Sequence, residues 1–245
     1  MVSIHTFFGR RFGFTQGKTS LKLTSLFRLS FVLFTGHAIG LSVSHAIALS
    51  DGGLRNVATA YTIIGPVALT VFFVQLLAKR FFSNTRILML TSLIATFSLG
   101  AVPFMPQGLE ASCWILVGSY CIWLVTTLQF WLVSGEMLSP GESRRVLPPI
   151  VCGSMGGAFV GGVLTWLLSG FLTPLNLLWI WALLMAVIAR ECHVLLKSDY
   201  GYLPASTEFE SEPRGKNQNS GAGFTASTSF LAALWFFTLL GWAAL

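Results

Sequence analysis

The chain has 245 residues, of which 54% are hydrophobic and 10% are charged, and its formal net charge is +6. A soluble domain carries about a quarter charged residues, so this composition excludes a soluble globular protein and indicates a polytopic membrane protein. The basic residues lie in short segments between apolar runs, which excludes a nucleic-acid-binding surface.

The N-terminal segment is basic and rich in hydroxyl groups. Residues 1–25 contain Arg10, Arg11, Lys18 and Lys22 and no acidic residue. We expect a basic cytoplasmic arm, with an organellar transit peptide as the alternative, because transit peptides share this composition. No compact apolar stretch with a small-residue cleavage site follows, so a cleaved secretory signal is not expected.

Six apolar runs follow, each close to the length of about 20 residues that a transmembrane helix needs. They extend over residues 26–49, 57–78, 87–104, 113–133, 149–171 and 175–189. A seventh run begins near Phe230 and reaches Leu245, so it either just crosses the bilayer or belongs to a longer chain. Before it lies a Ser-, Gly-, Glu- and Asn-rich segment that predicts a flexible linker. The predicted organisation is an arm (1–25), a six-helix bundle (26–189), a cytoplasmic linker (190–228) and a seventh helix (229–245).

The positive charges alternate along these spans. All but one of the 15 lysines and arginines lie before or at the start of the first span or after an even-numbered span, and Arg55 is the exception. The positive-inside rule therefore predicts a cytoplasmic N-terminus. A bacterial inner membrane is the first expectation, and a plastid or other organelle membrane is the alternative.

The fifth span carries a packing signal in its glycines, which are Gly153, Gly156, Gly157, Gly161 and Gly162. Gly153, Gly157 and Gly161 repeat every fourth residue and share one helix face. Small residues let two helix backbones approach closely in a membrane. We expect this face to be a helix-packing interface whose partner lies outside the chain, in a second half-bundle or in other membrane subunits.

Two histidines in the first span, His37 and His45, are candidate substrate-binding groups. Ionisable side chains at membrane depth are costly and often functional, and about 80° of helix rotation between the two lets them share a broad face. The alternative is that each imidazole stays neutral and bonds a neighbouring helix.

Gln129 and Glu136, in and just after the fourth span, complete the set of candidate substrate-binding groups. For Gln129 the alternative is a hydrogen bond between helices. For Glu136 it is an ion pair with Arg144 or Arg145, which follow in the same polar turn.

The chain shows no arrangement typical of an enzyme or a metal centre. Its four cysteines lie far apart and mostly within apolar runs, which favours buried apolar side chains over metal ligands. Neither a phosphate-binding loop nor a catalytic triad spacing is visible. We therefore expect no catalytic residue, no metal and no cofactor.

Two segments resemble a known family. The loop Leu77–Arg86 is similar to the loop between spans 2 and 3 of the major facilitator superfamily, although Lys79 and Phe82 replace its usual Asp and Gly. The aromatic pair Phe130-Trp131, the turn with its two arginines, and the glycine run after Pro148 resemble the ATP/ADP-translocase-like branch of that superfamily.

This resemblance implies a fold and a mode of action. Members have twelve spans in two related halves, each half a pair of three-helix repeats, with substrate bound at the midplane between them. The chain then corresponds to the N-terminal six-helix bundle and the start of a seventh helix. The resemblance implies that spans 1 and 4 line the substrate cavity and that spans 2 and 5 face the other half.

Two functions follow from this reading. The first is a transporter or half-transporter that moves nucleotides or other small solutes by alternating access. The alternative is a non-transporting subunit of a membrane complex that docks through its glycine-rich helix face. The spans hold no lysine or arginine deep in the bilayer, which argues against the transport of nucleotide phosphates by this chain alone.

Overall fold

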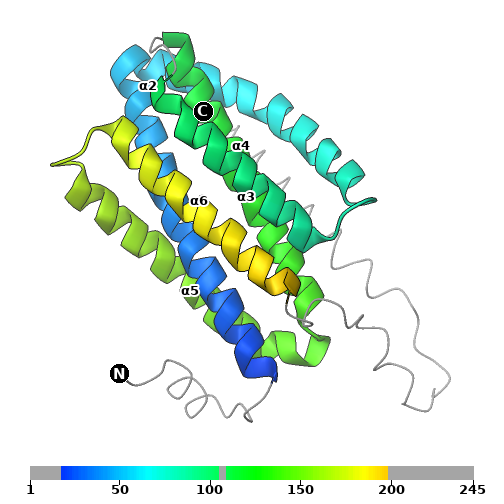
Figure 1. Ribbon diagram of the computed structural model, residues 1–245. Coiled ribbons are helices and arrows are strands. Elements are labelled where there is room, and N and C mark those ends of the chain that lie inside the picture. The colour runs from blue at the N-terminus through cyan, green and yellow to red at the C-terminus, as the bar shows by residue number, and fades with distance from the viewer. Residues whose placement is uncertain (1–17, 105–108, 198–245) are drawn as a thin grey trace, which may run out of the picture. The chain divides into compact units, whose positions relative to one another are not determined.

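The computed structural model describes residues 18–104 and 109–197, and every element in these two ranges is a helix. The long helices are α2 (Lys18–Ala78), α3 (Asn84–Ala101), α4 (Leu109–Met137), α5 (Pro140–Leu168) and α6 (Pro174–Lys197), and a short 3-10 turn, η1 (Val102–Phe104), follows α3 (Figure 1). All five long helices have the length and apolar composition to cross a membrane. The protein is therefore an integral membrane protein with a helical bundle.

Helix α2 consists of two legs that meet at Gly53. The backbone of this residue is non-helical, with φ of 59° and ψ of −153°, while helix continues on both sides. Figure 1 shows the two parts as a blue and a cyan limb. We call residues 18–52 the first leg and residues 54–78 the second leg. Predicted spans 1 and 2 lie one in each leg, and the expected loop between them is reduced to this single break.

Helix boundaries extend further than the apolar runs predict. The first leg begins at Lys18, inside the predicted arm, and α6 reaches Lys197, inside the predicted linker. The predicted polar turn at 134–145 is mostly helix, because α4 continues to Met137 and α5 begins at Pro140. The rest of the predicted arm and linker, and the predicted seventh helix, lie outside the described residues.

A capping box explains the early start of α5. The Ser139 side chain accepts a hydrogen bond from the backbone N–H of Glu142 (3.4 Å), and the Glu142 carboxylate accepts one from the backbone N–H of Ser139 (3.2 Å). These two bonds satisfy backbone donors that a helix start leaves free, and Pro140 occupies the first helical position, where its missing N–H costs nothing.

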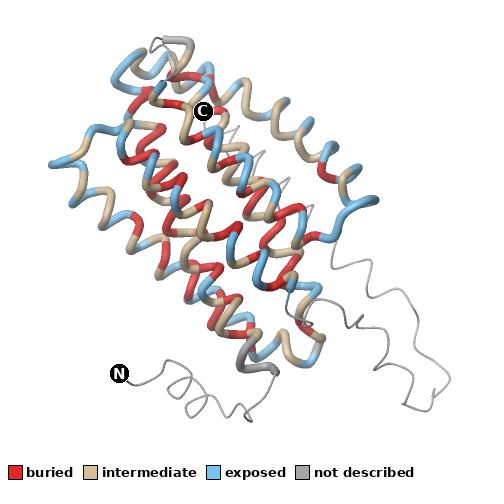
Figure 2. Tube along the Cα trace, in the orientation of Figure 1, coloured by how far each residue is buried: buried red, intermediate tan, exposed pale blue. Residues whose placement is uncertain are grey.

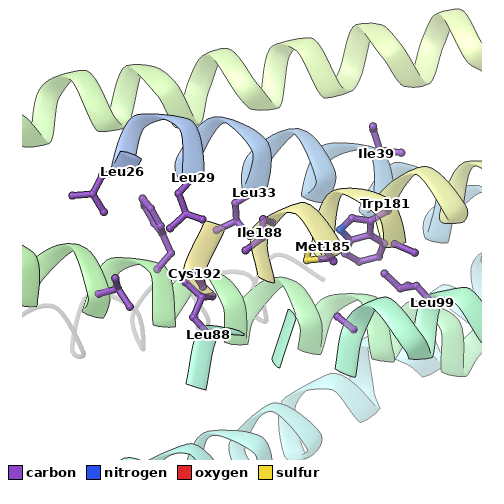
Figure 3. Packing of buried hydrophobic residues seen from close by; sticks show 14 of the residues in the cluster. Leu26, Leu29, Leu33, Ile39, Leu88, Leu99, Trp181, Met185, Ile188 and Cys192 are labelled. Carbon is purple, nitrogen blue, oxygen red and sulfur yellow. The ribbon is translucent and has the colours of Figure 1, made fainter. Parts of the chain in front are cut away.

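The main core is formed by buried residues of the first leg, α3, α4, α5 and α6. Figure 3 shows Leu29 and Leu33 of the first leg beside Met185 and Ile188 of α6, with Leu88 of α3 close by. Figure 2 shows that buried segments recur along these helices. In this core α6 contacts both the first leg and α3, and residues of α4 and α5, among them Phe130 and Ile150, complete it.

The indole of Trp181 is the largest fully buried side chain of the core, and it sits in a notch in the first leg. A Cβ atom at Gly40 would stand 2.1 Å from the indole, and one at Gly36 would stand 2.9 Å from it. Only the absence of side chains at these two glycines, one turn apart, allows α6 to approach the first leg here.

Candidate functional site

The glycine face of α5 is covered by the first leg of α2. A Cβ atom at Gly157 would stand 2.3 Å from the carbonyl oxygen of Phe31, and one at Gly161 would stand 2.5 Å from that of Thr35. Such separations leave no room for a side chain, so the two helix backbones are in contact. The expectation that this face needs a partner outside the chain is wrong for these glycines, because periodicity identifies a packing face but not its partner.

Glycines on the remaining part of the predicted interface differ in their surroundings. Gly153 is buried against Ser30, whose hydroxyl donates a hydrogen bond to the carbonyl of Ile150 across the same contact (3.2 Å). Gly156 lies beside the Phe31 ring at an ordinary contact distance, and nothing lies within 4 Å of the Cβ position of Gly162. The tight contact therefore involves one face of α5 only.

A row of polar side chains joins α2 to α4, and we call it the polar seam. Its contacts are Thr126 with His37 (3.0 Å), Ser119 with Ser44 (2.6 Å), Tyr120 with His45 (3.3 Å) and Tyr61 (2.7 Å), and Ser112 with Asn56 (3.0 Å). Along α4 the hydroxyl groups at 112, 119 and 126 recur every seventh residue, which is close to two helix turns and keeps them on one face.

The outer part of the polar seam contains a triad of His45, Tyr61 and Tyr120. The His45 Nδ1 lies 2.7 Å from the carbonyl oxygen of Leu41, which accepts only, so Nδ1 carries a proton. Nε2 is then the acceptor in the neutral ring, and it lies 3.0 Å from the Tyr61 hydroxyl. His45, Tyr61 and Tyr120 are each partly exposed.

The deep part of the polar seam is centred on His37, which is 2% exposed. The Thr126 hydroxyl donates to the carbonyl of Ile122 (2.6 Å), so the His37 Nε2 donates to Thr126 and Nδ1 is an acceptor. Nδ1 has no hydrogen-bond partner among residues 18–104 and 109–197. The ring makes edge contacts with Phe34 and Trp181, with centroids 6.0 and 6.2 Å away.

Two more buried polar atoms lack a hydrogen-bond partner within the part of the chain that the structure describes. They are Nε1 of Trp181, the residue that contacts the His37 ring, and Oε1 of Gln129. Gln129 follows Thr126 by three residues, so both lie on the same face of α4. Such buried unpaired groups cost about 1–3 kcal/mol each. Donor and acceptor groups from α2, α4 and α6 are thus left open at the deep end of the seam.

Glu136 stands apart from this arrangement. Its carboxylate accepts a hydrogen bond from the side-chain amide of Asn84 in α3. The structure records no ion pair between Glu136 and Arg144 or Arg145, all three of which it describes. Ten residues of helix, about 15 Å, separate Glu136 from Thr126. Of the four predicted binding residues, His37 and His45 contact α4 in the polar seam and Gln129 shares the Thr126 face of α4, whereas Glu136 contacts α3 near the end of α4.

Sequence reasoning missed the hydroxyl partners of the two histidines. The signal was the seven-residue spacing of Ser112, Ser119 and Thr126, which predicts a polar stripe on an otherwise apolar helix. Tyr61 lies eight residues after Gly53 and His45 lies eight residues before it, so a break at Gly53 brings the two to the same level.

Comparison with known proteins adds no family to this description. No family model, curated protein or solved structure matches the chain. The class of protein that the fold and composition define is a polytopic helical membrane protein.

Proposed function

We propose that this chain is a transporter or half-transporter of the major facilitator type, which moves a small polar solute by alternating access. The observation that carries the proposal is the open deep end of the polar seam, where His37, Gln129 and Trp181 leave two acceptors and one donor unpaired. Buried polar groups without partners destabilise a fold, so their retention favours a role in binding. A polar solute would supply the missing hydrogen bonds.

The contacts between helices support a pair of three-helix repeats. The first leg packs on α5 and α6, and the second leg packs on α4, which also contacts α3. The two legs then correspond to spans 1 and 2, and α3 to α6 correspond to spans 3 to 6. When span 1 is exchanged with 4, span 2 with 5 and span 3 with 6, each of these contacts becomes another contact of the same set. Transporter halves built from repeats have this property.

Charge distribution favours one class of solute. The sequence holds no lysine or arginine between Arg28 and Arg55 or between Arg86 and Arg144. Arg28 itself pairs with Glu191 of α6 at 2.8 Å. The part of the first leg that follows Arg28 and the helix α4 therefore offer hydrogen bonds but no lysine or arginine for a phosphate, which favours a neutral polar solute over a nucleoside triphosphate.

The alternative function, a non-transporting subunit that docks through the glycine-rich face of α5, requires this face to be accessible. Gly157 and Gly161 are covered by the backbone of the first leg, so this face offers nothing to another protein. A subunit role would need a different surface.

Reconstitution of the full chain into liposomes tests the proposal. Uptake of labelled adenosine, ADP, ATP and inorganic phosphate is measured under solute and proton gradients, and we expect adenosine to enter fastest. Gln129→Leu, which removes an open acceptor, should lower that uptake about ten-fold, the cost of one hydrogen bond of about 1.4 kcal/mol.

Gln75→Leu is the matched control, because Gln75 is also buried with an unpaired amide nitrogen but lies on the second leg, outside the polar seam. Its uptake should equal that of the unaltered chain. Failure of all four solutes to enter, under either gradient, contradicts the proposal.

A further inference from the structure

We propose that His45 binds the proton that drives transport, and that Tyr61 and Tyr120 pass the effect of this proton to the solute. The inference rests on the proposed function and adds the coupling ion. It starts from the hydrogen bonds of the triad, which are complete in one protonation state and incomplete in the other.

In the neutral state the triad has no spare donor. The His45 Nδ1–H donates to Leu41, one tyrosine hydroxyl donates to Nε2, and the other donates to the first tyrosine. The two hydroxyl protons thus fill the two available acceptor positions. Tyr61, at 3.0 Å, is nearer to Nε2 than Tyr120, at 3.3 Å.

Proton uptake changes the direction of both bonds. A proton that binds the lone pair of Nε2 makes this atom a donor to the Tyr61 oxygen, and Tyr61 then donates to Tyr120. The Tyr120 hydroxyl proton is left without an acceptor inside the triad. One proton enters and no covalent bond other than the new N–H is formed or broken, so the protonated state presents one additional hydrogen-bond donor.

An acceptor atom on the solute would satisfy this released donor. The protonated triad then binds the solute more tightly, and by thermodynamic linkage the bound solute raises proton affinity by the same factor. This reciprocity is what co-transport of a proton and a solute requires.

His45 is less enclosed by protein than His37. His45, Tyr61 and Tyr120 are partly exposed, whereas His37 is enclosed by Phe34 and Trp181. The titratable groups in contact with His45 are the two tyrosines, from the second leg and from α4. Among the residues that the structure describes, no ion pair involves His45.

The position of the triad along the helices also supports a proton-binding role for His45. His45 and Tyr61 each lie eight positions from the break at Gly53, one on each leg, which is about 12 Å of helix. An ionisable side chain at membrane depth is costly and often functional. The three side-chain and backbone partners of the His45 imidazole therefore favour a functional role over packing alone.

Nuclear magnetic resonance of the full chain, labelled with ¹⁵N-histidine in lipid nanodiscs, tests proton binding directly. The His45 signals are those that vanish in His45→Gln. We expect a protonated Nδ1 throughout and a reversible gain of a proton at Nε2 when the pH is lowered. Unchanged His45 signals as the pH is lowered overturn the inference, whatever the protein transports.

Proteoliposomes test the coupling, with the solute of the four above that enters fastest as the probe. An inward proton gradient should raise its initial uptake about ten-fold, within the usual range for two coupled sites. His45→Gln and Tyr120→Phe should both abolish this rise, while Tyr120→Phe keeps the His45 titration. His193→Gln, at an exposed position of α6, should keep both.

The outcomes separate the two proposals. Uptake that is equal with and without the proton gradient overturns the coupling role and leaves the transporter intact. A gradient effect that persists in His45→Gln overturns it as well. Absence of uptake of all four solutes overturns both.

Discussion

The first leg of α2 meets α5 and α4 through two different kinds of contact. Against α5 the backbones touch, and the positions of Phe31 and Thr35 leave no space for a Cβ at Gly157 or Gly161. Against α4 the contact includes a row of hydrogen bonds between side chains, such as Ser44 with Ser119, beside apolar packing such as Phe34 with Phe130. A steric contact has one arrangement, whereas hydroxyl groups can exchange donors and acceptors without moving a helix.

This difference assigns separate roles to the two sides of the leg. The α5 side fixes the position of the helix in the bundle. The α4 side carries groups whose bonding can change when a solute or a proton binds. Substitutions on the two sides should therefore differ in size and in kind.

The largest effect is expected from Gly157→Ala. The new methyl group would lie 2.3 Å from the Phe31 carbonyl oxygen, which belongs to the backbone and cannot rotate away. We expect a loss of about 3 kcal/mol of stability, the upper end for overpacking, measured as a lower midpoint of unfolding in mixed SDS micelles.

Gly162→Ala is the control on the same helix, because nothing lies within 4 Å of its Cβ position. It should be neutral or stabilising by up to about 1 kcal/mol, the difference in helix propensity. Equal unfolding midpoints for the two variants would show that the α5 side is not a steric contact.

A smaller effect is expected from Gly53→Ala, which tests whether the break keeps the second leg on α4. The φ of 59° and ψ of −153° at Gly53 belong to a region that essentially only glycine adopts. Strain of about 1–3 kcal/mol should appear in the same unfolding assay. The His45 ¹⁵N signals should also shift, because Tyr61 lies on the second leg.

The control for the break is Gly118→Ala, at a helical glycine in α4 with open space at its Cβ position. This variant should leave the His45 signals unchanged, and its stability should be unchanged or higher by up to about 1 kcal/mol. If Gly53→Ala behaves in the same way, the break does not position the second leg.

The smallest effect is expected from the double-mutant cycle of Ser44→Ala and Ser119→Ala. Hydrogen bonds between helices in a membrane contribute about 0.6 kcal/mol on average, so the coupling energy should be near this value. The cycle is measured by unfolding of the two single variants and the double variant.

A second cycle, of Ser42→Ala with Ser119→Ala, serves as the comparison, because Ser42 is exposed on the same leg. It should give no coupling. A coupling energy above about 2 kcal/mol between Ser44 and Ser119 would exceed the range for such bonds. The α4 side would then be as rigid as the α5 side, which contradicts the difference described above.

Composition and hydropathy predict most of the membrane-spanning helices. The apolar runs identify α3 to α6 and both legs of α2, because about 20 apolar residues in sequence have few alternatives to a membrane helix. They place the ends poorly, since polar residues such as those at 140–148 continue a helix outside the apolar core. The Ser139–Glu142 spacing predicts that start, although hydropathy does not.

The candidate site could be predicted only in part. Glycine spacing predicts that α5 has a packing face, but the partner of that face depends on tertiary structure. His37 and His45 stand out as polar residues in an apolar run, while the residues that bond them, Thr126 and Tyr120, lie more than 70 positions away. Which hydroxyl meets which imidazole follows from the antiparallel arrangement of the first leg and α4.

The close contact of the Trp181 indole with Gly40 of the first leg restricts which residues can occupy these two positions in related sequences. The indole occupies the volume that a methyl group at Gly40 would need. A larger side chain at position 40 therefore requires a smaller one at position 181. A natural variant with alanine or serine at position 40 should carry a smaller residue at 181, and each change alone should be rarer among related chains than the pair.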